Sequence, residues 1–142
     1  MITFRRLGHL GRWGNQLFQY AGTRLYAHLN GFSCAMPPWL GVEVFSDVAP
    51  WKGMQKFKAL VVPTLQLADF GATTWPERFQ RPLGRWSRGD MGKLWEHPRD
   101  NLNLYGYVQD PVTLAKLRQH RNLVRSWFRF RPEIERALRT AT

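Results

Sequence analysis

The feature that most constrains the fold is an N-terminal apolar segment followed by a glycine-rich turn and an amphipathic helix. Residues 2–6, ITFRR, favour a strand, and three glycines lie within residues 8–14. Apolar residues then recur at spacings of three and four, which predicts a helix over residues 15–29 with one face toward a core. The residues of that face are Phe18, Ala21, Gly22, Leu25, Tyr26 and Leu29. Asn30 and Gly31 are expected to end the helix, because Gly readily adopts the left-handed conformation.

A strand-to-helix turn of this kind can bind an anion. Glycines let the backbone approach a ligand, and the free N–H groups at a helix N-terminus attract phosphate. Asn15 and Gln16 add amide groups at this turn. The structural alternative is that Gly14 eases the turn, Asn15 caps the helix, and Phe18 and Tyr20 pack in the core.

Further strands are predicted along the chain. Residues 32–36 favour a second strand, which completes a βαβ unit of the kind found in nucleotide-binding folds. Residues 58–67 favour another strand, which Pro63 confines to a sheet edge or splits. Apolar and polar residues alternate over residues 101–109, which favours a further strand. The sequence therefore predicts an α/β fold.

The C-terminal region is predicted to be helical. Asp110 and Pro111 are a strong helix start, with Asp as the N-cap and Pro at the first helical position. This helix is expected to run to about Trp127, and another is expected to begin at Pro132. The short apolar face of the last helix comprises Ile134, Ala137 and Leu138.

Two stretches resemble the signatures of a known family. Residues 11–21, GRWGNQLFQYA, resemble the Gly-Arg-Leu-Gly-Asn-Gln-Met-Phe-Gln-Tyr-Ala signature of the family 11 glycosyltransferases, the α-1,2-fucosyltransferases. Trp13 replaces the usual Leu, and Leu17 replaces the usual Met. Residues 103–110, NLYGYVQD, resemble the Leu-x-Gly-Tyr-Phe-Gln-Ser segment of the same family. The two stretches occur in the family's order and at about its separation.

The resemblance implies a Rossmann-like N-terminal domain of a GT-B glycosyltransferase, an enzyme with its active site between two such domains. Residues 1–142 are then the acceptor-side domain, and the C-terminal donor-binding domain is expected to be missing. The chain alone is expected to be an inactive fragment, the product of a truncated gene, or one half of a split protein. The family's donor motif, His-x-Arg-x-Gly-Asp, is expected beyond residue 142. Residues 87–90, SRGD, lack its histidine and precede the second stretch, so we interpret that match as coincidence.

The reaction implied by the resemblance is the transfer of fucose from GDP-fucose to a galactoside hydroxyl of a glycan, with inversion. Asn15 is the expected catalytic residue. The residues expected to contact donor or substrate are Arg12, Gly14, Asn15, Gln16, Tyr107 and Gln109. An amide cannot act as a general base, for which the candidates are Asp47, Asp69 and Asp90. No metal or other cofactor is expected, because GT-B enzymes generally work without a divalent metal and the sequence contains no Asp-x-Asp pair.

The charge of the chain offers a rival interpretation. Its formal net charge is +11, and such an excess attracts nucleic acid, anionic membranes or phosphorylated ligands. No helix-turn-helix, zinc-finger or RNP pattern accompanies the charge, so no nucleic-acid partner is expected. A basic RNA-binding module nevertheless stays an alternative, as does a non-catalytic sugar- or nucleotide-binding half-domain. Peripheral contact with an anionic membrane is a further expectation from the charge.

Other residues bear on location and on metal binding. Cys34 is the single cysteine and is predicted to lie buried in a strand, so no intrachain disulfide forms and a reducing compartment fits. The histidines have no metal-ligand spacing. No apolar run approaches the roughly 20 residues of a membrane span, and the N-terminus lacks a signal-peptide pattern, so a cytoplasmic location is expected. Tryptophans and arginines in residues 73–95 are candidates for lining an acceptor sugar, with surface packing as the alternative.

Overall fold

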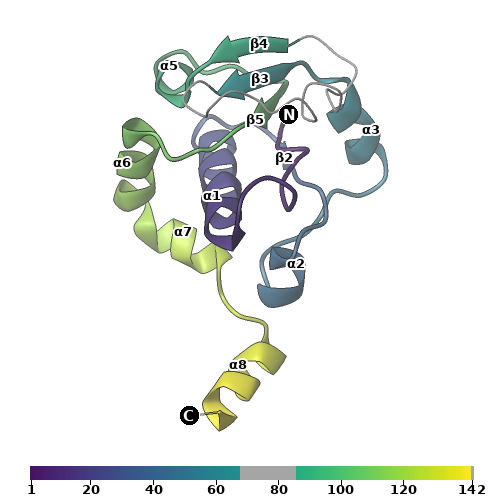
Figure 1. Cartoon of the computed structure of the whole chain (residues 1–142), viewed down its shortest axis with the longest axis vertical. Coiled ribbons are helices and arrows are strands. Elements are labelled where there is room, and N and C mark those ends of the chain that lie inside the picture. Colours follow the sequence, from purple (N-terminus) through teal and green to yellow (C-terminus); the bar gives the residue numbers. More distant parts are fainter. Residues whose placement is uncertain (68–85, 142) are drawn as a thin grey trace.

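The computed structural model describes residues 1–67 and 86–141, and its strands form one parallel sheet in the order β2-β1-β5-β3-β4 (Figure 1). The strands are β1 (Ile2–Thr3), β2 (Cys34–Ala35), β3 (Thr64–Leu67), β4 (Trp86–Gly89) and β5 (Leu102–Tyr105). The helices of the described residues are α1 (Trp13–Leu29), α2 (Gly41–Val44), α3 (Met54–Val61), α5 (Met91–Glu96), α6 (Pro111–Gln119), α7 (Arg121–Trp127) and α8 (Pro132–Thr140). The predicted α/β class is confirmed, and the architecture is compatible with a Rossmann-like fold. The Trp/Arg segment up to residue 85 and the base candidate Asp69 lie outside the described residues.

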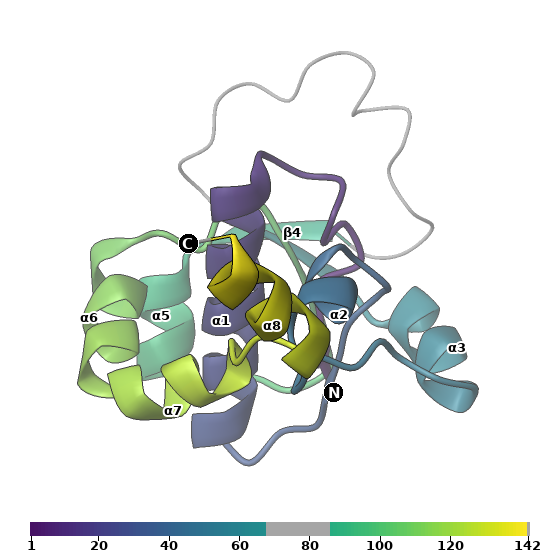
Figure 2. The ribbon, with the colours of Figure 1, turned by 90° about the horizontal axis from the view of Figure 1, so that it is seen from below.

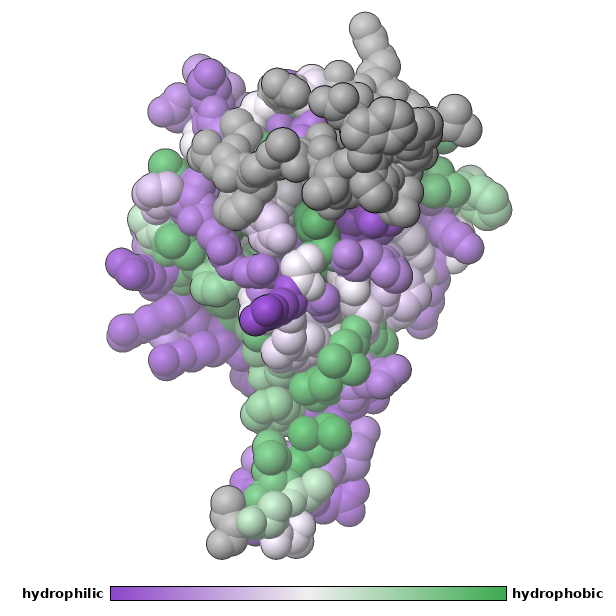
Figure 3. Space-filling view, viewed as in Figure 1, coloured by the Kyte–Doolittle hydropathy of each residue, from purple (hydrophilic) through white to green (hydrophobic). Residues whose placement is uncertain are grey.

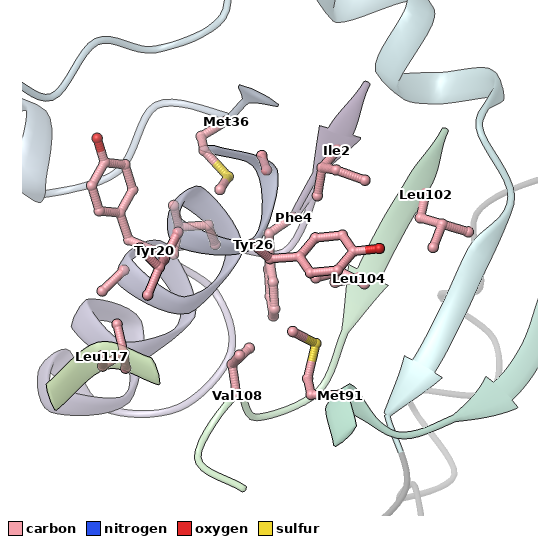
Figure 4. Close-up of a cluster of buried hydrophobic side chains, with 14 of the residues drawn as sticks. Ile2, Phe4, Tyr20, Tyr26, Met36, Met91, Leu102, Leu104, Val108 and Leu117 are labelled. Carbon is pink, nitrogen blue, oxygen red and sulfur yellow. The ribbon is translucent and has the colours of Figure 1, made fainter. Parts of the chain in front are cut away.

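Three helices, α1, α5 and α6, lie together on one side of the sheet (Figures 1 and 2). The side chains of alternate residues in and next to the three central strands, β1, β5 and β3, point toward these helices and form the core. These residues, each at most 4% exposed, are Ile2, Phe4, Leu65, Leu67, Leu102 and Leu104. Figure 4 shows Tyr26 of α1 among the core residues of β1 and β5, with Met91 of α5 beside it. The period-2 pattern of the strands therefore meets the apolar face of α1.

Polar side chains from the intervening positions join the same central strands. The Asn103 side chain accepts a hydrogen bond from the Arg5 backbone N–H (2.8 Å) and donates one to Thr64 Oγ1 (3.0 Å). The Arg5 guanidinium also donates to Thr64 Oγ1 (2.7 Å) and to the Leu60 carbonyl (2.7 Å). Burial lowers the pKa of the Arg5 guanidinium from its ordinary value. These bonds connect the segments of β1, β3 and β5 across the sheet.

The N-terminal predictions were correct for the elements but not for the whole helix face, because Phe18 and Leu29, expected to face the core, are each 39% exposed. The predicted helix 15–29 is α1, which begins two residues earlier, at Trp13, and Gly31 follows it with φ +68°. The first two strands form as predicted but are only two residues long each. Cys34 lies in β2 and is partly rather than fully buried.

The prediction of one strand over residues 58–67 was wrong in its first half. Residues up to Val61 belong to helix α3, whose Met, Gln, Lys, Ala and Leu residues all favour a helix. Pro63 ends this segment, and β3 begins at the next residue. Pro63 therefore splits the predicted segment, which was one of the two alternatives. The other alternative, an edge position, was wrong, because β3 lies between β5 and β4.

The C-terminal helices start where predicted. Asp110 caps α6 by accepting a hydrogen bond from the Thr113 N–H (2.9 Å), but the predicted single helix is interrupted at His120 and continues as α7. No residue of α8 is buried, and it extends away from the rest of the molecule (Figure 1). The guanidinium of Arg131, which precedes α8, donates to the Val42 carbonyl (2.7 Å) and so fixes the start of α8 to α2.

Candidate functional site

The candidate site lies where the chain leaves β1 and β5, which are neighbouring parallel strands. The loop after β1 leads into α1, and the loop after β5 leads into α6. In open α/β sheets, ligands bind at the carboxyl ends of the strands, where such loops and helix N-termini meet. The stretches that resemble family signatures lie at these loops: residues 11–21 cover the end of the first loop and the start of α1, and residues 103–110 cover the end of β5 and the loop after it.

Gly11 brings the first loop against the second. Its φ of +77° is a left-handed conformation that favours glycine. A Cβ atom at this position would lie 2.8 Å from Asn15 Nδ2 and 2.8 Å from Tyr107 Cε1, too close for any side chain. Only glycine therefore allows Asn15 and the Tyr107 ring to pack around this turn.

A hydrogen bond joins the two predicted binding residues Asn15 and Gln109. Gln109 Nε2 donates to Asn15 Oδ1 over 3.0 Å, across 94 residues of sequence. Both side chains are half-buried. Within the described part of the chain, the Asn15 NH2 group and the Gln109 carbonyl oxygen make no further hydrogen bond. One amide donor group and one acceptor therefore remain for a polar ligand such as a sugar hydroxyl.

Gln19 holds the two loops together beneath this pair. Its side chain is fully buried, and its Nε2 donates to the Leu10 carbonyl (3.1 Å) and to the Gly106 carbonyl (3.2 Å). Its Oε1 is buried without a hydrogen-bond partner in the described residues. Sequence reasoning missed this residue, although its place one helical turn after Asn15, on the same face of α1, was a signal that could have found it.

Gln16, Arg12 and Gly14, which were also predicted to bind donor or substrate, lie at the turn before α1 or in the first turn of α1. Gln16 donates through Nε2 to the Gly11 carbonyl (3.1 Å), so it stabilises the turn. Arg12 is exposed and is the N-cap residue of α1, without a side-chain capping bond. Gly14 lies within the first turn of α1 and not in the preceding turn, so the prediction that it eases the turn was wrong. The structural alternative that Asn15 caps the helix was wrong too, since Asn15 lies inside it.

The N-terminus of α1 is suited to negative charge. The helix has seventeen residues, no side chain caps it, and its first turn contains no acidic residue. Its free backbone N–H groups and the positive end of the helix dipole both favour an anion. The site thus combines a neutral amide pair with an electropositive helix end.

The two described base candidates lie elsewhere. Asp47 forms an ion pair with Arg24 (3.0 Å), which lies nine residues, or about 13 Å, along α1 from Asn15. Asp90 is the N-cap of α5 and accepts from the Lys93 N–H (2.8 Å). Neither of these two carboxylates forms a hydrogen bond with Asn15 or Gln109.

A cavity of about 260 Å³ lies beside the Arg24–Asp47 pair. It is lined by Tyr20, Arg24, Cys34, Met36, Asp47 and Ala49. Burial raises the pKa of the Cys34 thiol to about 12 and raises the pKa of Tyr20, against the opposing effect of Arg24. Both groups are therefore neutral near pH 7, and the guanidinium is already paired, so the cavity presents no unbalanced charge to a ligand.

None of the described helices is both long and apolar enough to cross a membrane. In residues 1–67 and 86–141, no group of three His, Cys, Asp or Glu side chains lies close enough together to hold a metal ion. No protein-family model, curated protein or solved structure matches the chain.

Proposed function

We propose that this chain is the N-terminal, acceptor-side domain of a GT-B fucosyltransferase, which transfers fucose from GDP-fucose to a galactoside hydroxyl with inversion. The observation that carries the proposal is the Asn15–Gln109 hydrogen bond of 3.0 Å. It joins the two stretches that resemble the family 11 signatures, which are distant in sequence. A residue pair brought together at the carboxyl ends of parallel strands supports a shared binding role.

In this proposal the amide pair binds and orients a sugar. The free Asn15 NH2 group donates to one sugar oxygen, and the Gln109 carbonyl accepts from a neighbouring hydroxyl. The N-terminus of α1 stabilises the negative charge that develops on the leaving diphosphate. Arg12, exposed at that end of the helix, and Tyr107, beside Gly11, complete the proposed contacts.

A general base is also required to take the proton of the acceptor hydroxyl. Of the proposed aspartates, the described Asp47 and Asp90 have other partners, Arg24 and the Lys93 N–H, and the identity of the base is left open by the proposal. No metal enters the proposal. The donor-binding domain is proposed to lie beyond this chain, so transfer requires that second half.

The same geometry also fits the second candidate, a half-domain that binds a sugar or nucleotide without turnover. The open amide groups and the uncapped helix end favour binding by either candidate. The two candidates differ in one readout, which is GDP release in the presence of an acceptor.

Saturation-transfer NMR on the chain tests the shared binding claim with three separate ligands: GDP, GDP-fucose and a β-galactoside. We expect at least one of them to bind. Gln109→Ala and Asn15→Ala are each expected to weaken that binding about tenfold, since each removes a hydrogen-bonding group from a half-buried pair. Asn122→Ala, at an exposed position of α7, is the matched control and is expected to bind as the unmodified chain does.

Two results separate the outcomes. Because transfer requires the donor-binding half, binding by this chain alone without GDP release fits both candidates. GDP release from GDP-fucose and an acceptor after that half is added supports a transferase, whereas binding that still gives no release supports the binding-only candidate. Failure of all three ligands to bind, or binding that survives both pair substitutions, refutes the proposed site.

A further inference from the structure

Helix α3 has its apolar side on the outside of the molecule. The one buried residue of this helix is Ala59. On a helical projection, Met54, Phe57 and Val61 lie on the opposite side. Their exposed fractions are 67%, 64% and 78%, and the adjacent Leu60 is 48% exposed. Most helices at a protein surface have the reverse arrangement, with the apolar face toward the core.

Lysines flank this apolar face on both sides. Lys56 and Lys58 lie on either side of it along the helix, and Lys52 precedes the helix; all three are exposed. Residues 48–67 contain no Asp or Glu. Trp51, half-buried, stands at the start of this segment. We call the exposed surface of Lys52, Met54, Lys56, Phe57, Lys58 and Val61 the α3 surface.

The α3 surface is on the periphery of the fold. Figure 1 shows α3 at the edge of the molecule, away from α1, α6 and α7. At that edge in Figure 3, hydrophobic residues form the outermost surface, with hydrophilic residues next to them. The Arg5 guanidinium donates to the Leu60 carbonyl (2.7 Å), which attaches the end of the helix to the sheet. The helix is therefore held in place while its apolar side stays exposed.

We propose that the α3 surface docks the protein on an anionic lipid bilayer. A short helix with a bulky apolar face, flanking lysines and no acidic residue matches the two layers of a membrane interface: the apolar side chains enter the acyl boundary, and the ammonium groups meet anionic head groups. The long lysine side chains can remain in the head-group layer while the helix lies in the plane of the membrane.

A nucleic acid fits this surface less well. Phosphate groups need cations, but they offer nothing to Met54 and Val61, and only one exposed aromatic ring, Phe57, is available in the helix for base stacking. The denser set of basic residues on α6 and α7 would suit a polyanion better: Arg118, Arg121 and Arg125 are exposed and form no ion pair with a described carboxylate. They provide a control of equal charge at a different surface. The membrane proposal does not depend on the fucosyltransferase proposal.

Vesicle co-sedimentation with the full chain tests the proposal, using phosphatidylcholine vesicles with and without phosphatidylglycerol. We expect binding to the anionic vesicles and about 100-fold weaker binding to the neutral ones, since three lysines near the surface contribute about fivefold each. The triple variant Lys52→Gln/Lys56→Gln/Lys58→Gln is expected to lose the same factor. The charge-matched control Arg118→Gln/Arg121→Gln/Arg125→Gln is expected to lose less than fivefold.

A second pair of variants tests the apolar component. Phe57→Gln/Val61→Gln leaves the charge unchanged and is expected to weaken binding at least tenfold. Leu40→Gln/Val112→Gln, at exposed apolar positions on other surfaces (53% and 43%), is expected to bind as the unmodified chain does. Circular dichroism confirms that each variant is folded, which is expected because all the substituted residues are exposed.

Three results overturn the proposal. One is equal binding to neutral and anionic vesicles. Another is a loss of affinity in the arginine variant as large as in the lysine variant, which would show that general charge decides binding. The third is tighter binding to single-stranded RNA than to anionic vesicles under the same salt conditions.

Discussion

Gly22 is predicted to be a position where even one methyl group destabilises the fold. It lies in the middle of α1 and is buried. A Cβ atom there would lie 2.6 Å from Val108 Cγ1 and 3.2 Å from Thr113 Cγ2. Both neighbours are fully buried, with 0% exposure. The glycine therefore lets α1 pack directly against the loop after β5 and the first turn of α6.

Two opposing effects determine how much Gly22→Ala changes the free energy of unfolding. Alanine is favoured over glycine in a helix interior by about 1 kcal/mol. Inserting a methyl group into a well-packed core costs about 1–3 kcal/mol, and 2.6 Å is far below a normal carbon–carbon contact, so the upper part of that range applies. We expect a net loss of about 1–2 kcal/mol in the free energy of unfolding.

Gly14→Ala is the matched control in the same helix. Nothing lies within 4 Å of a Cβ atom at Gly14, so the helix-propensity gain is unopposed and the free energy of unfolding is expected to rise by up to about 1 kcal/mol. Urea denaturation followed by circular dichroism measures both variants. Adding Val108→Ala to Gly22→Ala should recover part of the lost stability relative to the sum of the single changes. A Gly22→Ala variant as stable as the unmodified chain would refute the packing argument.

Two further predictions concern the cap of α6 and the cysteine. Asp110→Ala removes the acceptor of the Thr113 N–H bond and is expected to lower the free energy of unfolding by about 1 kcal/mol. Asp110→Asn keeps an acceptor oxygen and is expected to retain most of the stability of the unmodified chain. Equal losses for the two variants in urea denaturation would contradict a capping role. Burial raises the pKa of the Cys34 thiol to about 12, so at pH 8 native alkylation by iodoacetamide is expected to be on the order of a thousand times slower than in the urea-unfolded chain. Because the folded protein keeps this thiol protonated, the native rate should keep rising above about pH 9, where an ordinary thiol levels off, and a plateau there would count against the raised pKa.

Local chemistry explains which parts of the fold could be predicted from the sequence. The apolar spacing of α1, the glycine after it and the cap at Asp110 act within a few residues, so their pattern is visible in the chain. Residues 58–61 were misassigned because Val61 and its apolar neighbours suit a strand, whereas the helix preference of the preceding residues decides the structure. Strand order and register depend on pairing between distant segments, which no local pattern specifies.

The candidate site could be predicted only in part, for the same reason. Asn15 and Gln109 were expected from the family resemblance, but their direct contact depends on β1 and β5 being neighbours in the sheet. Gln19 was overlooked because a buried glutamine on a helix face resembles any other polar helix residue until its two carbonyl partners are known. The four-residue spacing of Asn15 and Gln19 puts them on one helix face, but no local pattern shows what that face contacts.

The position of β1 in the sheet has a consequence for biosynthesis. One of its two neighbours is β5, with Ile2 beside Leu102, so the first strand acquires its second partner only after about a hundred more residues have been made. At about 5–20 residues per second, the ribosome takes about 5–20 s to supply that partner. Throughout this interval the nascent N-terminal strand has an open edge that is exposed to chaperones and to neighbouring nascent chains. Closure of the sheet centre and assembly of the Asn15–Gln109 pair then both wait for the synthesis of residues 102–109.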